Sequence, residues 1–178
     1  MFDKAFEDLI LKEGGYSNDS IDRGGETKFG ITISVARSYG YNGAMKDLSL
    51  KLAKEIYKKN YWRKEFESFH WVIAEFLFDC NVNHGYRGMS LILQNSINLL
   101  TKNNIETDGV AGKITYRTAL KLDQEKLFYM LFSYRCKYFI DICKNDESQE
   151  KYIFGWTKNR VWLIFAKLLL ESSSNRIF

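Results

Sequence analysis

Residues 71–81 form the segment that most constrains the fold of this chain. Their sequence, WVIAEFLFDCN, is apolar on nearly every side of a helix, and such a helix is stable only when other elements cover it. The chain has enough apolar residues to do so, because 46% of its 178 residues are hydrophobic and 16% are aromatic. We therefore predict a globular protein built around a buried central helix.

The remaining apolar residues also recur at helical spacing, so the sequence predicts a mainly α protein. Helices are expected at residues 3–13, 49–60, 89–100, 113–121, 123–143 and 148–171, with a short one that starts at Thr32 or Ser34 and ends before Gly40. Ser49, Asp123 and Ser148 are the predicted N-caps, because their side chains can accept a hydrogen bond from a free backbone N–H. We expect at most one short hairpin, near residues 24–32.

Glu13 ends the first predicted helix and is the strongest candidate for a catalytic acid. The two glycines that follow it stop a helix, and its position four residues after Leu9 places it near the apolar stripe. Partial desolvation and the negative end of the helix dipole both disfavour the ionised carboxylate, so we expect the pKa of Glu13 to be raised. A raised pKa suits a general acid. The alternative is an ordinary solvated glutamate in a last helical turn.

A second carboxylate and a hydroxyl follow within twenty residues, in the stretch DRGGETKFGIT that starts at Asp22. Together with Glu13, Asp22 and Thr27 would suit acid/base hydrolysis of a glycosidic bond. Asp22 could instead be an ordinary turn residue, and Thr27 a residue that simply favours strands. Glu26 is the alternative second carboxylate, although a strand would send it to the face opposite Thr27.

These motifs resemble glycoside hydrolase family 108, the muramidases of phage endolysins and related bacterial wall-cutting proteins. The family pattern is similar to EGGY, then D-x-G-G-x-T, then F-G-I-T, and all three are present. Later motifs look like the family's C-terminal peptidoglycan-binding region: YKKNYW at 57–62, NVNHG at 81–85, Gln94, DGVAGKIT at 108–115 and GWTKNRV at 155–161. The resemblance covers nearly the whole chain.

The resemblance implies a role for each candidate. Glu13 would be the general acid, Asp22 the second acidic residue, acting as base or as a stabiliser of positive charge, and Thr27 the hydroxyl that positions water. It implies a lysozyme-like, two-lobed helical fold with no metal or organic cofactor. Residues 1–70 would form the catalytic lobe, residues 71–172 a helical lobe packed against it as one globular unit, and residues 173–178 a tail.

The chain departs from the family pattern at two turns. Ser20 stands where a proline usually precedes the Asp22 turn, and Gly112-Lys113-Ile114-Thr115 replaces Gly-Pro-Lys-Thr. The chain contains no proline at all. These losses make the turns less stiff but remove no catalytic group.

Further residues are candidates for substrate contact. Tyr16 and Trp62 could offer aromatic faces to sugar rings, although aromatics at helical spacing usually belong to the core. Asn81, Asn83 and His84 could bind the N-acetyl or lactyl groups, or could form a structural hydrogen-bond network at the end of the buried helix. Gln94 belongs to the same predicted cleft wall. The residues Asp108, Gly109, Gly112 and Thr115 resemble a wall-binding repeat, but a turn followed by a helix start explains them equally well.

The composition excludes several other classes. A net charge of +4 and the absence of a concentrated basic run give no support to nucleic-acid binding. Three cysteines do not make a disulfide scaffold, and neither histidine has ligand-like spacing with them. The longest apolar run, residues 161–170, is interrupted by Lys167 and is too short to span a bilayer.

The expected partner is peptidoglycan, and we expect no stable insertion into a membrane. The expected state is a monomer, because no segment of the sequence has the pattern of a coiled coil. No basic and apolar leader opens the sequence, so we expect synthesis in the bacterial cytoplasm and action in the periplasm or cell wall. A holin or an export system would then release the protein, for cell lysis or for release of other proteins through the wall.

Two rival functions use the same residues differently. A lytic transglycosylase would need Glu13 but not Asp22, and would leave 1,6-anhydro ends. A non-catalytic peptidoglycan-binding module would keep the fold without turnover, and the intact set of Glu13, Asp22 and Thr27 argues against it.

Overall fold

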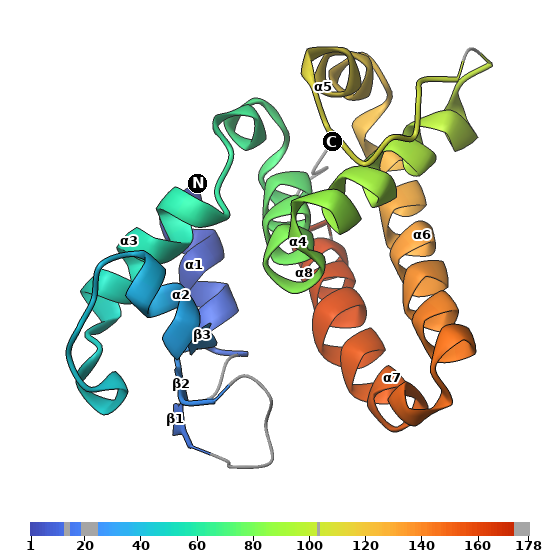
Figure 1. Ribbon diagram of the computed structural model, residues 1–178. Helices are drawn as coiled ribbons and strands as arrows, with labels where there is room; N and C mark the ends of the chain where they lie inside the picture. Colours follow the sequence, from blue (N-terminus) through green and yellow to red (C-terminus); the bar gives the residue numbers. More distant parts are fainter. Residues whose placement is uncertain (13–14, 19–24, 103, 173–178) are drawn as a thin grey trace. The chain divides into compact units, whose positions relative to one another are not determined.

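The computed structural model describes residues 1–12, 15–18, 25–102 and 104–172, which form helices and one small sheet (Figure 1). The prediction of a mainly α fold with a short hairpin is confirmed. Within the described residues, no helix is long and apolar enough to cross a membrane. The chain divides into two compact units, Met1–Arg63 and Lys64–Phe178.

Two amphipathic helices form the core of the first unit. Helix α1 spans Phe2–Ile10 and helix α3 spans Leu50–Asn60. Phe6 of α1 packs against Tyr57 of α3 with ring centroids 5.7 Å apart. Helix α1 ends earlier than residue 13, because the Lys12 N–H bonds the Leu9 carbonyl at 2.9 Å and tightens the last turn.

The first unit also contains a three-stranded antiparallel sheet in the order β1-β2-β3. Its strands are β1 Tyr16–Ser17, β2 Thr27–Lys28 and β3 Ile31–Thr32. The predicted hairpin is the β2–β3 pair, whose turn residues Phe29 (φ 53°) and Gly30 (φ 73°) both lie in the left-handed region. Positive φ at both positions is the geometry of the tight hairpin turn that matches strand twist. Strand β1 was not predicted.

Side-chain caps set the helix starts in this unit. Thr32 ends β3 and accepts a bond from the Val35 N–H at 3.3 Å, so that helix α2 starts at once and spans Ile33–Ser38. Ser49 accepts from the Leu52 N–H at 3.2 Å and caps α3 as predicted. A short 3-10 turn, η1 Met45–Asp47, lies between the two helices.

Helix α4, Trp71–Leu100, is the central element of the second unit and follows the 3-10 segment η2 Lys64–Ser68. Every residue from 72 to 81 is buried, which confirms the central buried helix. The two predicted helices at 71–81 and 89–100 join into this one element across a kink at Gly85 (φ 66°, ψ 174°).

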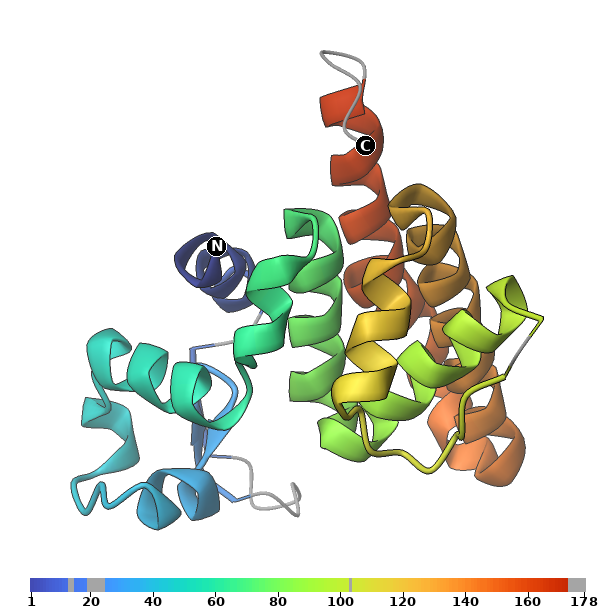
Figure 2. The ribbon, with the colours of Figure 1, turned by 90° about the horizontal axis from the view of Figure 1, so that it is seen from above.

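Helix α5 spans Lys113–Leu120, and α6 spans Gln124–Asn145 and packs along α4 (Figures 1 and 2). As predicted, Asp123 caps α6 by accepting from the Lys126 N–H at 2.9 Å. The rings of Phe76 and Phe128 meet edge to face between α4 and α6, 5.7 Å apart at 80°.

The C-terminal part of the chain is less regular than the single helix expected from Ser148. Asp146 is the cap, because its carboxylate accepts a bond from the Ser148 N–H at 3.0 Å. The 3-10 turn η3 Glu147–Gln149 leads into helix α7 Glu150–Trp156, a π-helical segment η4 Thr157–Trp162 and helix α8 Leu163–Ser172.

Candidate functional site

Thr27 is the predicted catalytic residue that the structure places, whereas Glu13 and Asp22 lie outside the described residues. Thr27 is half-buried in the middle strand β2, opposite Ser17 of β1 and Thr32 of β3. No hydrogen bond joins the Thr27 hydroxyl to any other part of the chain that the structure describes. Its hydroxyl is therefore available to hydrogen-bond a water molecule or a substrate.

In the sequence, the two candidate carboxylates stand close to the strands of the sheet that carries Thr27. Glu13 stands three residues before Tyr16, the first residue of β1. Asp22 belongs to the connection between β1 and β2, two strands that pair with each other. All three predicted catalytic residues thus belong to one short stretch of the sequence, which also contains β1 and the start of β2.

Contacts from both neighbouring segments hold the hairpin in place. The buried Tyr57 of α3 donates from its hydroxyl to the Phe29 carbonyl at 2.9 Å. The Ile33 N–H bonds the Glu26 carbonyl at 2.9 Å, and the Lys28 ammonium donates to the Lys46 carbonyl. These bonds fix the backbone on both sides of Thr27, which is the support that a positioning hydroxyl needs.

The two aromatic candidates of the first unit differ in exposure. Tyr16 pairs with Lys28 and is 45% exposed, so its ring is open to a ligand. Trp62 is 9% exposed and packs edge-on against Phe2, with centroids 5.4 Å apart. Trp62 therefore belongs to the core of this unit, and the sugar contact predicted for both residues stays a prediction.

Two of the candidates on α4, Asn83 and His84, take part in a hydrogen-bond network. Asn81 is 2% exposed. Asn83 donates from its amide to the Asp79 carbonyl at 2.7 Å and to the Asp79 carboxylate at 3.2 Å. His84 accepts from the Arg135 side chain through Nε2 at 3.2 Å. These contacts match the structural alternative from the sequence, and substrate contact by the three residues stays a prediction.

Asp79 and Arg135 are the centre of that network, and no sequence pattern indicated their pairing. Arg135 of α6 is fully buried and donates to the Asp79 carboxylate at 2.6 Å and to the Arg160 carbonyl at 2.7 Å. The Arg160 guanidinium reaches the other Asp79 oxygen at 3.3 Å. Both acid oxygens are thereby paired, as a buried carboxylate requires.

This environment fixes the protonation of His84. Burial is the main cause that lowers its pKa to about 3, and the neighbouring Arg135 charge contributes in the same direction. His84 is therefore neutral at physiological pH, which leaves Nε2 free to accept the bond from Arg135.

Gln94 organises the loop between α4 and α5. Its amide nitrogen donates to the Asp108 carboxylate at 2.7 Å and to the Val110 carbonyl at 3.1 Å. Its amide oxygen accepts from the Gly109 N–H at 3.0 Å. Gly109 has a φ of 79°, so the expected turn is present here. The role predicted for Gln94 in substrate binding stays a prediction.

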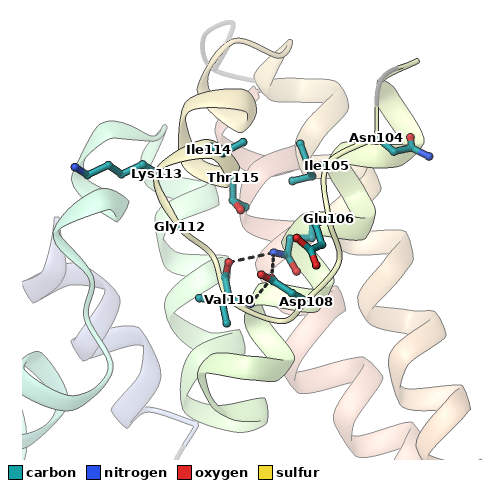
Figure 3. A pocket seen from close by; sticks show the side chains of 10 residues that line it. Asn104, Ile105, Glu106, Asp108, Val110, Gly112, Lys113, Ile114 and Thr115 are labelled. Carbon is teal, nitrogen blue, oxygen red and sulfur yellow. Dashed lines mark hydrogen bonds between the residues drawn. The ribbon is translucent and has the colours of Figure 1, made fainter.

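A pocket lies above this loop, and we call it the loop pocket (Figure 3). Its volume is about 610 Å³. It is lined by Gln94, Asn104, Ile105, Glu106, Asp108, Val110, Gly112, Lys113, Ile114 and Thr115. The motif DGVAGKIT had pointed to this region, but Ile105 and Glu106 precede the motif and were missed. Within the described residues, no group of His, Cys, Asp and Glu could hold a metal ion.

Comparison with protein families accounts for both halves of the chain. Residues 6–85 match the model of Glycosyl hydrolase 108, and residues 89–161 match the model described as Predicted Peptidoglycan domain. Residues 6–85 therefore form a glycoside hydrolase family 108 domain, followed by a peptidoglycan domain. The first match contains Glu13, Asp22 and Thr27, and the second contains Gln94 and the loop pocket.

Solved structures agree with this assignment. The chain is similar to the structure of Brucella abortus SagA, with 25% sequence identity and a TM-score of 0.76, over 95% of this chain and 94% of that one. A search of curated proteins returned no match. The two family matches make this chain a glycoside hydrolase that acts on peptidoglycan.

Proposed function

We propose that this chain is an N-acetylmuramidase that cleaves the β-1,4 bond between N-acetylmuramic acid and N-acetylglucosamine in peptidoglycan. The observation that carries the proposal is the order Glu13, Asp22, Thr27 inside the stretch that matches family 108. Thr27 supports the proposal in two ways. Its hydroxyl has no hydrogen-bond partner among the described residues, and its hairpin is held by the bond from the Tyr57 hydroxyl to the Phe29 carbonyl.

In this mechanism the two carboxyl groups have different tasks. Glu13 protonates the leaving glycosidic oxygen as general acid. Asp22, with Thr27, positions or activates the water that attacks the anomeric carbon. Thr27 can accept a hydrogen bond from that water and donate one in turn, because a hydroxyl does both.

The stereochemistry of the product reports the separation of the two carboxyl groups. A separation of about 5 Å lets the second carboxylate act as nucleophile and retains the configuration, whereas about 6.5–9.5 Å leaves room for water and inverts it. NMR of the first-formed anomer distinguishes these two routes.

The decisive experiment is mass spectrometry of soluble products from purified peptidoglycan. Wild type, Glu13→Gln, Asp22→Asn and Thr27→Val are compared, with Glu7→Gln on the exposed face of α1 as a matched control. We expect reducing muropeptides from wild type and Glu7→Gln. Both active-site carboxylate variants should lose these products by about 10²–10⁴-fold, the range for loss of a general acid or base.

The rival functions give different results in the same experiment. Anhydro products that survive Asp22→Asn would identify a lytic transglycosylase. An absence of any product from wild-type protein would identify a peptidoglycan-binding module without catalysis.

For the cellular role, we propose synthesis in the bacterial cytoplasm and action as a monomer in the periplasm or wall. A holin or an export system would release the protein, for lysis or for passage of other proteins through the wall. Cell fractionation with and without co-expressed holin tests the route, because retention in the cytoplasm under both conditions would reject a holin.

A further inference from the structure

The loop pocket combines apolar walls with acidic groups. Ile105, Val110 and Ile114 supply aliphatic surface, and the carboxylates of Glu106 and Asp108 lie on the same side of the pocket (Figure 3). The Lys113 side chain points away from them in the same view, whereas the Arg87 guanidinium donates to the Asp108 carbonyl at 2.8 Å and offsets part of the Asp108 charge. A ligand that joins an aliphatic stem to a positive charge would complement these walls and the carboxylate of Glu106.

The charge on Asp108 is fixed by its hydrogen bonds. One carboxylate oxygen accepts from the Gln94 amide at 2.7 Å and from the Val110 N–H at 2.8 Å. The bond from Gln94 is the main cause that lowers the pKa of Asp108, and the Val110 N–H adds to it. Gln94 is 1% exposed. Its amide nitrogen and its amide oxygen are both hydrogen-bonded to the loop, so a buried side chain holds Asp108 in place.

Thr115 is a second and independent indication of a ligand. This residue of α5 is 4% exposed, and its side chain points into the pocket toward the carboxylates (Figure 3). Its hydroxyl bonds to no other group in the described part of the chain. The hydroxyl is therefore available to hydrogen-bond a ligand that enters the pocket.

We propose that the loop pocket binds the free primary ammonium at the end of the diamino acid in the peptidoglycan peptide stem. The isoleucines pack against the methylene groups of that side chain, as aliphatic stems commonly pack on apolar surface. Glu106 and Asp108 pair with the ammonium, and the Thr115 hydroxyl accepts one of its three N–H groups. The inference rests on peptidoglycan as the substrate of the proposed muramidase.

The chemistry favours the peptide over the glycan as occupant. The amino groups of the glycan are acetylated and uncharged, and the lactyl carboxylate of an unsubstituted muramic acid would be repelled by Glu106 and Asp108. A diamino acid whose amine is used in a cross-link has lost its charge as well. The pocket would therefore select stems that are not cross-linked at this amine.

The test is isothermal titration calorimetry of the full chain with the synthetic tetrapeptide L-Ala-γ-D-Glu-L-Lys-D-Ala. The matched probe is the same peptide acetylated on the side-chain amine. Glu106→Gln and Thr115→Val test the pocket, and Glu147→Gln, an exposed glutamate on η3, is the matched control. Circular dichroism and thermal unfolding establish that each variant is folded.

We expect the free-amine peptide to bind wild type and the Glu147→Gln control equally. Acetylation of the peptide and Glu106→Gln should each weaken binding about tenfold or more, because each removes a charge-assisted hydrogen bond. Thr115→Val should weaken it several-fold.

Three results would overturn the inference: no binding of the free-amine peptide, equal binding of the acetylated peptide, or unchanged affinity in folded Glu106→Gln and Thr115→Val. The peptide contains no glycosidic bond, so this assay is independent of hydrolysis. Failure of the muramidase proposal would appear instead as missing products from whole peptidoglycan.

Discussion

At the scale of single residues, the buried pair of Asp79 and Arg135 shows how strongly one contact can constrain the second unit. The two side chains are 2% and 0% exposed and meet at 2.6 Å. The Arg135 guanidinium also lies over the rings of Phe76 and Phe139, at 5.2 and 5.5 Å. Removing one member leaves the other charged and buried, which costs far more than the pair itself contributes.

The first prediction is that Asp79→Asn lowers the free energy of unfolding by about 3–5 kcal/mol. The control is Asp141→Asn, which removes an exposed pair with Lys137 and should change it by no more than about 0.5–1 kcal/mol. Urea denaturation followed by circular dichroism measures both. Equal effects of the two substitutions would contradict the structural role given to the buried pair.

The second prediction concerns His84 and pH. Its pKa is about 3 in the folded protein and near the ordinary 6.5 in the unfolded chain, so between these values the unfolded chain binds more protons. The His84 contribution to stability is complete above pH 6.5 and is lost as the pH falls toward 3, by at most about 1.4 kcal/mol per pH unit.

His84→Gln keeps an acceptor for Arg135 but cannot be protonated, so its stability should fall less between pH 6.5 and 4.5. Denaturation at a series of pH values compares the two proteins. Parallel pH profiles for wild type and variant would show that His84 does not titrate as its burial requires.

At the scale of elements, two glycines that lie in helices, Gly85 and Gly155, should respond to substitution by alanine in opposite ways. Gly85 breaks α4 with φ 66° and ψ 174°, a conformation open almost solely to glycine. Gly155 lies in α7, and a Cβ added there would meet nothing within 4 Å.

The third prediction is that one substitution type changes stability in opposite directions at these sites. Gly85→Ala should lower the free energy of unfolding by about 1–3 kcal/mol, because alanine strains the kink. Gly155→Ala should raise it by about 0.5–1 kcal/mol, because alanine favours a helix interior. Thermal and urea unfolding measure both, and a neutral Gly85→Ala would mean that α4 can straighten without loss.

Element starts were the part of the fold that sequence predicted best. Thr32, Ser49 and Asp123 cap their helices through bonds to backbone groups three residues ahead, so all partners lie within one short stretch. The start of the last helix was mispredicted, because Asp146 and not Ser148 accepts the capping bond. The π-helical segment that follows carries Arg160 to Asp79, 81 residues away, and no local pattern encodes that contact.

At the scale of the whole molecule, the candidate catalytic residues and the loop pocket lie in different family matches. The candidate catalytic residues belong to residues 6–85, and the loop pocket belongs to residues 89–161. Loss of the general acid should therefore leave attachment to peptidoglycan intact.

The fourth prediction is that Glu13→Gln pellets with insoluble peptidoglycan as fully as wild type, while release of soluble reducing ends falls by about 10²–10⁴-fold. Pelleting on ice and a reducing-end assay at working temperature measure the two properties. Glu106→Gln serves as the reciprocal control, since it should reduce pelleting. Loss of pelleting in Glu13→Gln would show that binding depends on the catalytic residue itself.

The sequence by itself determined the helical class, the caps, the hairpin turn and the family, because periodicity, capping and motif order all depend on residues close together in the chain. Only the tertiary structure decided what His84 and Gln94 contact. His84 meets Arg135 across 51 positions, and Gln94 meets Asp108 across 14. A polar residue near the end of a buried helix must find a partner, but which partner it finds depends on how helices pack side by side.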